Sequence, residues 1–258
     1  IGSVDEALSH INGGGSLSEI KPSILQETLR RANAFKKRPG GVLEADDGNK
    51  YALRSSSKDF EHLHASVASE VQRHLGLSSS RVAFVGKGGK RRSYAVDAPT
   101  LNRARNLDDA APDEVARMMM ADLISGVDDR KSSGIGFVGE SAVPTTVPSA
   151  LTRLSELKIS DRTKESVSAM KPVSGDGMYN TYYRELRDAQ KRSFQEEIQR
   201  LMERAQEFNF TDYKNVLYRD GELSSAEKTH LNIIQKIVES RIEVLARSRD
   251  ALVQRLEG

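Results

Sequence analysis

The sequence contains no cysteine, no tryptophan and no long hydrophobic run. Without cysteine, disulfides, thiol catalysis and cysteine-ligated zinc or iron–sulfur centres are excluded. No apolar stretch approaches the roughly 20 residues that span a membrane, and none has the form of a signal peptide, so no membrane partner is expected. The net charge is only +2, with both signs interspersed, which gives no strong nucleic-acid signal.

Histidine is scarce as well, and the five histidines do not have the spacing of metal ligands. His62 and His64 lie two residues apart on a predicted helix and are expected to diverge around it, while His74 lies further along the same helix. We interpret these three histidines as surface residues of the helix, and we predict no metal ligand among them.

The length of 258 residues and the 37% of hydrophobic residues suffice for one large domain or two small ones. Because the chain begins with Ile1 and not with Met, we expect these residues to begin inside a longer gene product or after a processing cut. The expected location is the cytoplasm or an assembled particle, for example a virion.

The first half of the chain predicts a mixture of helices and antiparallel strands. A capping box over 16–19 opens a predicted helix that runs to Phe35, before the basic residues of 36–38 and a Pro-Gly-Gly stop. Strands are predicted over 42–45 and 50–54, joined by a hairpin turn at 46–49. The next predicted elements are a helix over 58–75 that ends at Gly76, strands over 81–85 and 93–96, and an apolar helix from Pro112 to the Asp128-Asp129-Arg130 turn.

This order of elements, with the turn pattern "Leu-Ile-x-Gly-x-x-Asp-Arg", resembles the atypical kinases of the HipA-like and phosphoinositide-kinase-like kind. The resemblance covers residues 40–140. It implies that Arg54 occupies the position of the strand lysine that holds the ATP phosphates, and that Glu70 is the helix carboxylate that pairs with it. It also implies that Asp129 is the catalytic base, followed by Arg130, with ATP and magnesium as cofactors of an active enzyme.

Several positions depart from the pattern of the family. Arg54 replaces lysine, and a planar guanidinium is a different ligand for phosphate than a compact ammonium. Lys131 replaces a histidine, and Gly134 stands where an asparagine would bind the metal. No aspartate occurs over 141–148, where the second magnesium ligand belongs, although Asp176 is an alternative as a displaced ligand. Since phosphoryl transfer depends on positioning and on charge neutralisation by metal, these losses favour an inactive protein.

The second half predicts a mostly helical region. Helices are predicted over 148–159 and 179–208, a connector over 209–221, and a final helix that a capping box opens at Ser224 to Glu227 and that runs through Leu256. The whole chain is predicted to be an α+β, two-lobed kinase-like fold, with a small antiparallel-sheet N-lobe carrying one helix and a larger, mostly helical C-lobe. The predicted segments are 1–39 (a helical extension), 40–98 (the N-lobe) and 99–258 (the C-lobe).

Three functional hypotheses follow. The preferred one is a pseudokinase-like scaffold, structural or assembly component that contacts a protein partner or another copy through its helical C-terminal half. The second is an active atypical kinase that transfers the ATP γ-phosphate to a protein or small molecule with Asp129 as base. In the third, the kinase resemblance is accidental, and Arg54–Glu70 and Asp129–Arg130 belong to an unrelated α+β protein-binding module.

Overall fold

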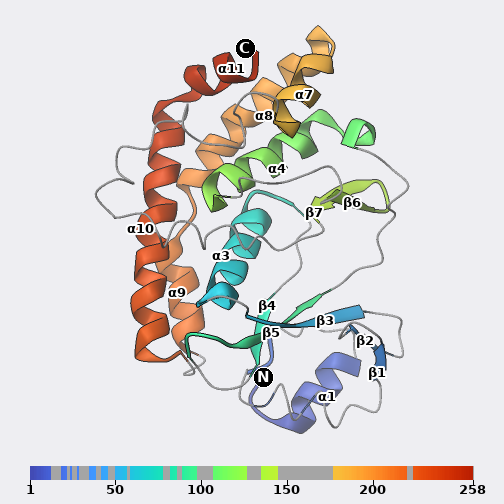
Figure 1. The fold of residues 1–258 in the computed structure, drawn as a ribbon, viewed down its shortest axis with the longest axis vertical. Helices are drawn as coiled ribbons and strands as arrows, with labels where there is room; N and C mark the ends of the chain where they lie inside the picture. The colour runs from blue at the N-terminus through green and yellow to red at the C-terminus, as the bar shows by residue number, and fades with distance from the viewer. Residues whose placement is uncertain are drawn as a thin grey trace. The chain divides into compact units, whose positions relative to one another are not determined.

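The structure is a computed structural model, and its elements are traced in Figure 1. It describes residues 1–12, 19–21, 24, 28, 35–38, 42–45, 50–56, 59–77, 82–85, 89–97, 107–126, 135–144, 177–219 and 223–257. By contacts between Cα atoms the chain divides into two compact units. Unit 1 comprises 1–69, 80–100 and 210–232, and unit 2 comprises 70–79, 101–209 and 233–258.

Unit 1 is built on a five-stranded antiparallel sheet with the strand order β1-β2-β3-β5-β4 (Figure 1). The strands are β1 (Phe35–Arg38), β2 (Val42–Ala45), β3 (Lys50–Ser55), β4 (Val82–Val85) and β5 (Ser93–Asp97). The register aligns Glu44 with Lys50 at the β2–β3 hairpin, as the predicted turn requires, although the turn residues themselves lie outside the described residues. The strands predicted over 42–45, 50–54 and 93–96 are therefore confirmed, and the strand predicted over 81–85 is confirmed from Val82 onward.

Helices complete unit 1. Helix α1 (Val4–Asn12) lies at the N-terminus, α3 (Glu61–His74) begins in this unit, and α9 (Phe210–Arg219) and the first turns of α10 (Ser225–Arg247) also belong to it. Helix α3 ends as predicted at Gly76, whose φ of 84° is readily adopted by glycine. The two predicted capping-box residues of α10 form the expected bonds, because Glu227 N–H donates to Ser224 Oγ and Ser224 N–H donates to Glu227 Oε2.

Unit 2 is mostly helical. A short 3-10 turn, η3 (Leu107–Asp109), precedes α4 (Pro112–Ser125), and α4 is followed by the antiparallel hairpin of β6 (Ile135–Val138) and β7 (Ser141–Pro144). The remaining helices are α7 (Met178–Glu185), α8 (Asp188–Gln206), the rest of α10, and α11 (Arg249–Glu257). Helix α4 packs beside α8, and α7 packs against α11 (Figure 1).

The core of unit 2 follows the predicted apolar stripes. In α4 the side chains of Val115, Leu123 and the three consecutive methionines are at most 1% exposed. The predicted stripes of the C-terminal helices are also buried, at Phe194, Ile198, Leu201, Leu231, Ile234, Val238, Leu245, Leu252 and Leu256. Helical periodicity was therefore sufficient to find these faces.

Four local predictions were wrong. Residues 35–38 form strand β1, not the end of a helix, because their backbone pairs with β2. The predicted helix over 179–208 is interrupted after Glu185, where Leu186 is extended and Gln190 Oε1 accepts from the Arg187 backbone N–H to start α8. The predicted connector contains helix α9, and the final helix divides at Ser248 into α10 and α11.

Two further predictions fall outside the described residues, namely the helix over 148–159 and the loop that contains Asp176. The segment boundaries at 39/40 and 98/99 stay predictions. Within the described residues, no helix combines the length and apolar character that crossing a lipid bilayer demands.

Candidate functional site

Arg54, the residue that the resemblance assigns to phosphate binding, lies beside the buried Tyr94 in unit 1. Arg54 of β3 is exposed and pairs in register with Tyr94 of β5, so the two side chains share one face of the sheet. Tyr94 is 3% exposed, and its hydroxyl donates to Glu61 Oε1 over 3.2 Å. The Glu61 carboxylate, in the first turn of α3, is thus hydrogen-bonded to the residue that pairs with Arg54 in the sheet.

The pKa of Tyr94 reflects this setting. Burial raises the pKa of Tyr94 to about 12, and the nearby carboxylate of Glu61 adds to the rise, while the charge of Arg54 acts in the opposite direction. Tyr94 therefore remains a protonated donor at neutral pH. Sequence reasoning missed both Tyr94 and Glu61, because periodicity alone identifies neither a cross-strand partner nor a helix–sheet contact.

Glu70, the helix carboxylate chosen from the sequence, forms an ion pair on its own helix. Its carboxylate accepts from Arg73 one turn along α3, and its side chain is 28% exposed. The expectation that this carboxylate has a cationic partner is met by a neighbour at i+3. Glu70 belongs to unit 2 and Arg54 to unit 1, and pairing between them stays a prediction.

Asp129 and Arg130 lie outside the described residues, but the elements on either side of their turn are described. Helix α4 ends with Gly126 at a φ of 73°, with its N–H donating to the Asp122 carbonyl, and β6 begins at Ile135. The predicted apolar helix and the short apolar strand that follows it are confirmed, whereas the predicted turn between them lies outside the described residues.

Buried polar contacts anchor the last turns of α4. The Tyr179 hydroxyl donates to Asp122 Oδ2 over 2.5 Å, and Arg241 Nη1 donates to the Leu123 carbonyl over 2.9 Å. The N–H of Ala142 in β7 donates to Glu114 Oε2 over 3.2 Å, which ties the hairpin to the start of the same helix. The C-terminal end of α4, which precedes residues 127–130, is therefore held by α7 and α10, and the start of α4 is held by the β6–β7 hairpin.

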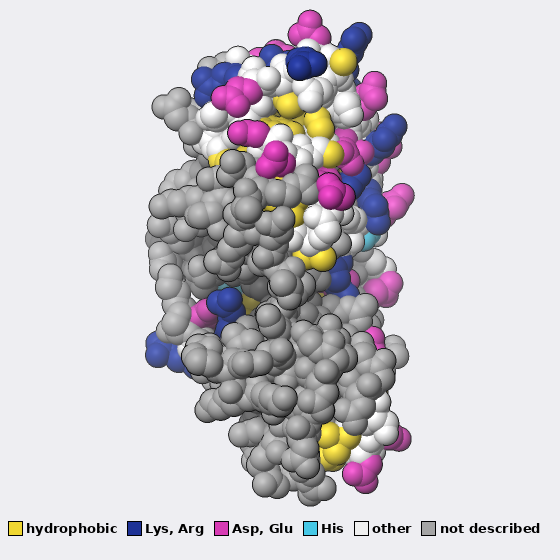
Figure 2. Space-filling view, turned by 90° about the vertical axis from the view of Figure 1, so that its right-hand side faces the viewer, with side chains coloured by type: hydrophobic (Ala, Val, Ile, Leu, Met, Phe, Trp, Pro, Cys, Tyr) yellow, Lys and Arg dark blue, Asp and Glu magenta, His cyan; other side chains and the backbone are white. Residues whose placement is uncertain are grey.

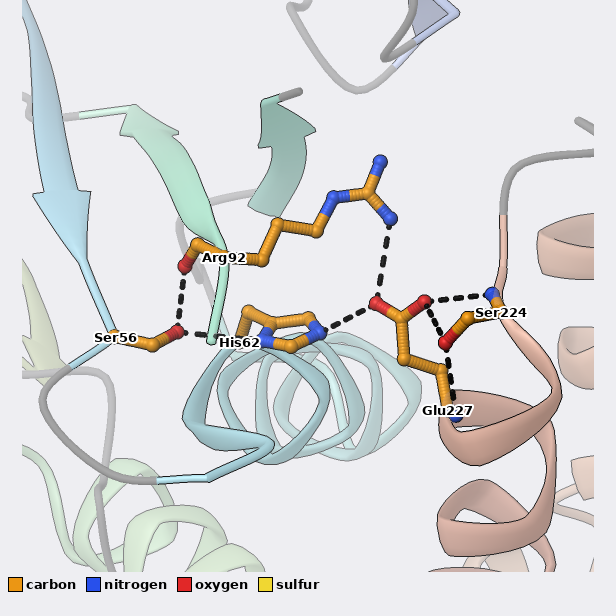
Figure 3. Close-up of polar contacts among 5 residues, drawn as sticks. All are labelled: Ser56, His62, Arg92, Ser224 and Glu227. Atoms are coloured by element: carbon orange, nitrogen blue, oxygen red, sulfur yellow. Dashed lines mark hydrogen bonds and ion pairs between the residues drawn. The ribbon is translucent and has the colours of Figure 1, made fainter. Parts of the chain in front are cut away.

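A second group of polar residues lies buried in unit 1, as Figure 3 shows. His62 Nε2 donates to Glu227 Oε1 over 2.8 Å, and Arg92 Nη1 lies 3.4 Å from the same oxygen. The side chains of His62 and Glu227 are fully buried, and that of Arg92 is 1% exposed.

The interpretation of His62 and His64 as surface residues was wrong, because their exposed fractions are 0% and 1%.

The environment of Glu227 keeps it ionised. Burial by itself would raise the pKa of Glu227, but hydrogen bonds from His62 and from Ser224 outweigh the burial and lower it to about 2. Since an ionised carboxylate only accepts, the His62 Nε2–H must be the donor in their contact. The carboxylate thus serves both as the cap of α10 and as the partner of two buried basic side chains.

The order Ser56–His62–Glu227 resembles that of an activated nucleophile, but its geometry does not perform that chemistry. Ser56 Oγ lies 3.2 Å from His62 Nδ1, yet its hydroxyl donates to the Arg92 carbonyl over 2.6 Å (Figure 3). The single hydroxyl hydrogen is therefore directed away from the imidazole, and no solvent reaches His62 or Glu227. We assign this network to the structure of unit 1.

No three His, Asp or Glu side chains converge as a metal site within the part of the chain that the structure describes. The catalytic residues implied by the resemblance would act on nucleotide held near Arg54 and a metal held near the Asp-Arg turn. Within unit 1 the described residues include the exposed cation on β3 and the carboxylate of Glu61, and within unit 2 they include the anchored helix that precedes residues 127–130.

Comparison with solved structures shows that the chain has a kinase-like α+β fold. The crystal structure of a Helicobacter pylori proinflammatory kinase, CtkA, matches it with a TM-score of 0.50 at 12% sequence identity, over 86% of this chain and 95% of that chain. No family model and no curated protein matches the sequence. At this identity the likeness shows the fold alone, so the HipA-like or phosphoinositide-kinase-like assignment stays a prediction.

Proposed function

We propose that this chain is a catalytically degenerate, kinase-fold protein that works through protein contacts as a scaffold or assembly component. The observation that carries the proposal is the position of the β6–β7 hairpin. Strand β6 begins directly after Gly134, where the resemblance implies a metal-binding asparagine, and β7 lies within residues 141–148, where the resemblance implies a second magnesium ligand and no aspartate occurs. Without both ligands, the metal that neutralises the transferred phosphoryl group lacks its protein anchors.

The helical C-terminal half supplies a surface for such contacts. In unit 2 a cavity of about 460 Å³ lies between α8 and the junction of α10 with α11. Its wall is mainly polar and includes Gln199, Met202, Gln206, Arg247, Arg249 and Asp250. On the described part of the face shown in Figure 2, Lys and Arg side chains are mixed with Asp and Glu side chains. Mixed charge of this kind does not favour a polyanion, and it suits a polar protein interface.

The second candidate function is an active kinase that transfers the ATP γ-phosphate, with Asp129 as base. It is favoured by the likeness to a solved kinase and by the arrangement around Arg54, whose exposed guanidinium is accessible to a phosphate. In this alternative Glu70 holds Arg54, and within unit 1 the Glu61 carboxylate is hydrogen-bonded to Tyr94, the residue that pairs in register with Arg54.

Calorimetric titration with ATP and ADP, with and without magnesium, distinguishes the two functions. For the scaffold we expect no magnesium-dependent binding up to millimolar nucleotide. The kinase alternative predicts binding that disappears in Asp129→Ala and Arg54→Ala but persists in the matched controls Asp128→Ala and Arg91→Ala. That second pattern would overturn the proposal of a degenerate site.

The contact surface has its own test. Ala251 is exposed and lines the cavity, whereas Gln254 is exposed on the same helix and does not line it. If the protein self-assembles through this surface, Ala251→Arg lowers the association measured by sedimentation velocity at least about tenfold, and Gln254→Arg does not. Equal behaviour of the two variants would place the contact elsewhere.

A further inference from the structure

Unit 1 contains a contact between two histidines that come from distant parts of the chain. His64 of α3 and His230 of α10 lie with their Nε2 atoms 2.8 Å apart, and their residues are 1% and 9% exposed. Two residues further along α3, the Ser66 hydroxyl lies 2.6 Å from the Tyr213 hydroxyl of α9. Helix α3 is thus held to both α9 and the start of α10.

The histidine contact accepts only one arrangement of protons. A hydrogen bond between two Nε2 atoms needs one N–H donor and one bare nitrogen, so a single proton lies between the rings. Protonation of both rings would set two N–H groups against each other at 2.8 Å. A proton on His64 Nδ1 would leave the hydrogen bond intact, but it would place a charge on a residue that is 1% exposed and whose Nδ1 has no hydrogen-bond partner among the described residues. The closed contact therefore opposes the protonation of His64.

The surroundings oppose protonation as well. Of the titratable groups near the pair, His62 on α3 acts on His64 electrostatically, and the Glu227 carboxylate on α10 is already engaged by His62 and by Arg92 beside β5. The Tyr213 hydroxyl on α9 is engaged by Ser66. Burial lowers the pKa of His64 to about 3, with further contributions from His230 and His62.

The same contact holds a strained residue. Phe60, just before α3, has a φ of 62°, which a bulky side chain rarely adopts. Its ring stacks on His230 with centroids 4.2 Å apart, and its N–H donates to the Lys90 carbonyl over 2.6 Å. Loss of the stacking partner removes one of the contacts that support this conformation.

We propose that Phe60, His64 and His230 form a pH-sensitive latch, which closes α9 and the start of α10 onto α3 near neutral pH and opens when the pair is protonated. The proposal does not depend on nucleotide binding or on the scaffold function. The direction of the pH dependence follows from the linkage between proton binding and opening. Because His64 in the open form regains its ordinary pKa of about 6.5, opening becomes more favourable as the pH falls below that value, by about tenfold per pH unit.

Hydrogen–deuterium exchange at pH 7.5 and pH 5.5, corrected for intrinsic rates, tests the latch. In the wild type we expect amides of α9 and of the first two turns of α10 to lose protection about tenfold at pH 5.5. Helix α4 of unit 2 should keep its protection and serves as the internal reference. In His64→Gln, whose side-chain amide can donate to a neutral His230 or accept from a protonated one through Oε1, the loss should disappear, and in the control His74→Gln it should remain.

Three results would overturn the latch. The first is equal protection of α9 at both pH values in the wild type. The second is a loss of similar size in α4, because that would show global destabilisation. The third is a loss that persists in His64→Gln, because another group would then be responsible. If His64→Gln does not fold, the change in amide protection of α9 relative to α4 in the wild type still tests the latch.

Discussion

Glu227 and His62 are 165 residues apart in the sequence and form a buried hydrogen bond of 2.8 Å. The bond joins the first turn of α10 to the first turn of α3, and Arg92 beside β5 approaches the same carboxylate oxygen. One side chain therefore connects a helix cap, a second helix and the edge of a strand within unit 1. The first two predictions concern this carboxylate.

Replacing Glu227 with Ala should strongly destabilise the protein. The substitution leaves the buried basic groups of His62 and Arg92 without their anion, and removal of one partner from a buried pair costs about 3–5 kcal/mol. Urea unfolding at pH 7 measures the loss. Ser224→Ala, which removes only the hydroxyl of the cap, should cost about 1 kcal/mol. Similar losses in both variants would contradict the role given to the buried pair.

Acid should weaken the native state through the same residue. The pKa of Glu227 is lowered from 4.5 to about 2, so the unfolded chain binds the proton more readily. The stabilisation is fully present above pH 4.5 and is lost as the pH falls from about 4.5 to about 2, with an upper size of about 3 kcal/mol. Unfolding free energies over this range should decline less steeply in Glu227→Gln than in the wild type. Identical slopes would rule out Glu227 as the source.

The Tyr94–Glu61 contact is expected to stabilise the packing of α3 on the sheet. A double-mutant cycle of Tyr94→Phe and Glu61→Gln should give a coupling free energy of about 1 kcal/mol, because each variant removes one side of the hydrogen bond. The pairing of Tyr94→Phe with Asp59→Asn, a nearby exposed residue, serves as control and should be additive. A coupling near zero in the first cycle would show that the contact contributes nothing.

In unit 2, Tyr179→Phe should destabilise the end of α4. The change leaves the buried Asp122 without one of its donors, and a hydrogen bond to a charged group contributes about 1.5–3 kcal/mol. Tyr183→Phe is the matched control on the same helix, since its hydroxyl only meets the neutral amide of Gln195 and should cost about 1 kcal/mol. Thermal unfolding measures the loss of stability in both variants. A smaller loss for Tyr179→Phe than for Tyr183→Phe would refute this prediction.

Prediction from sequence succeeded where the information was local and periodic. The apolar stripe of α4, the stop at Gly76 and the capping box at Ser224 and Glu227 each depend on residues within a few positions of one another. It failed where a distant partner decided the outcome. Residues 35–38 became a strand because β2 pairs with them, and α9 formed within a stretch that had been interpreted as a connector.

The candidate site shows the same division. The resemblance assigned Arg54 and Glu70 as a pair, and that pairing stays a prediction, whereas no local pattern could show that Glu61 contacts Tyr94 on the sheet. Likewise, the interval of two residues between His62 and His64 suggested surface positions, whereas both are buried against α10.

By itself the sequence determined the α+β character, the order of the elements and the absence of typical metal ligands at the positions beside the hairpin, because these depend on residue type and periodicity. Only the tertiary structure decided which polar side chains are withdrawn from water and paired. Burial and pairing arise between segments more than a hundred residues apart, as for His62 with Glu227 and His64 with His230, and no local pattern encodes such contacts.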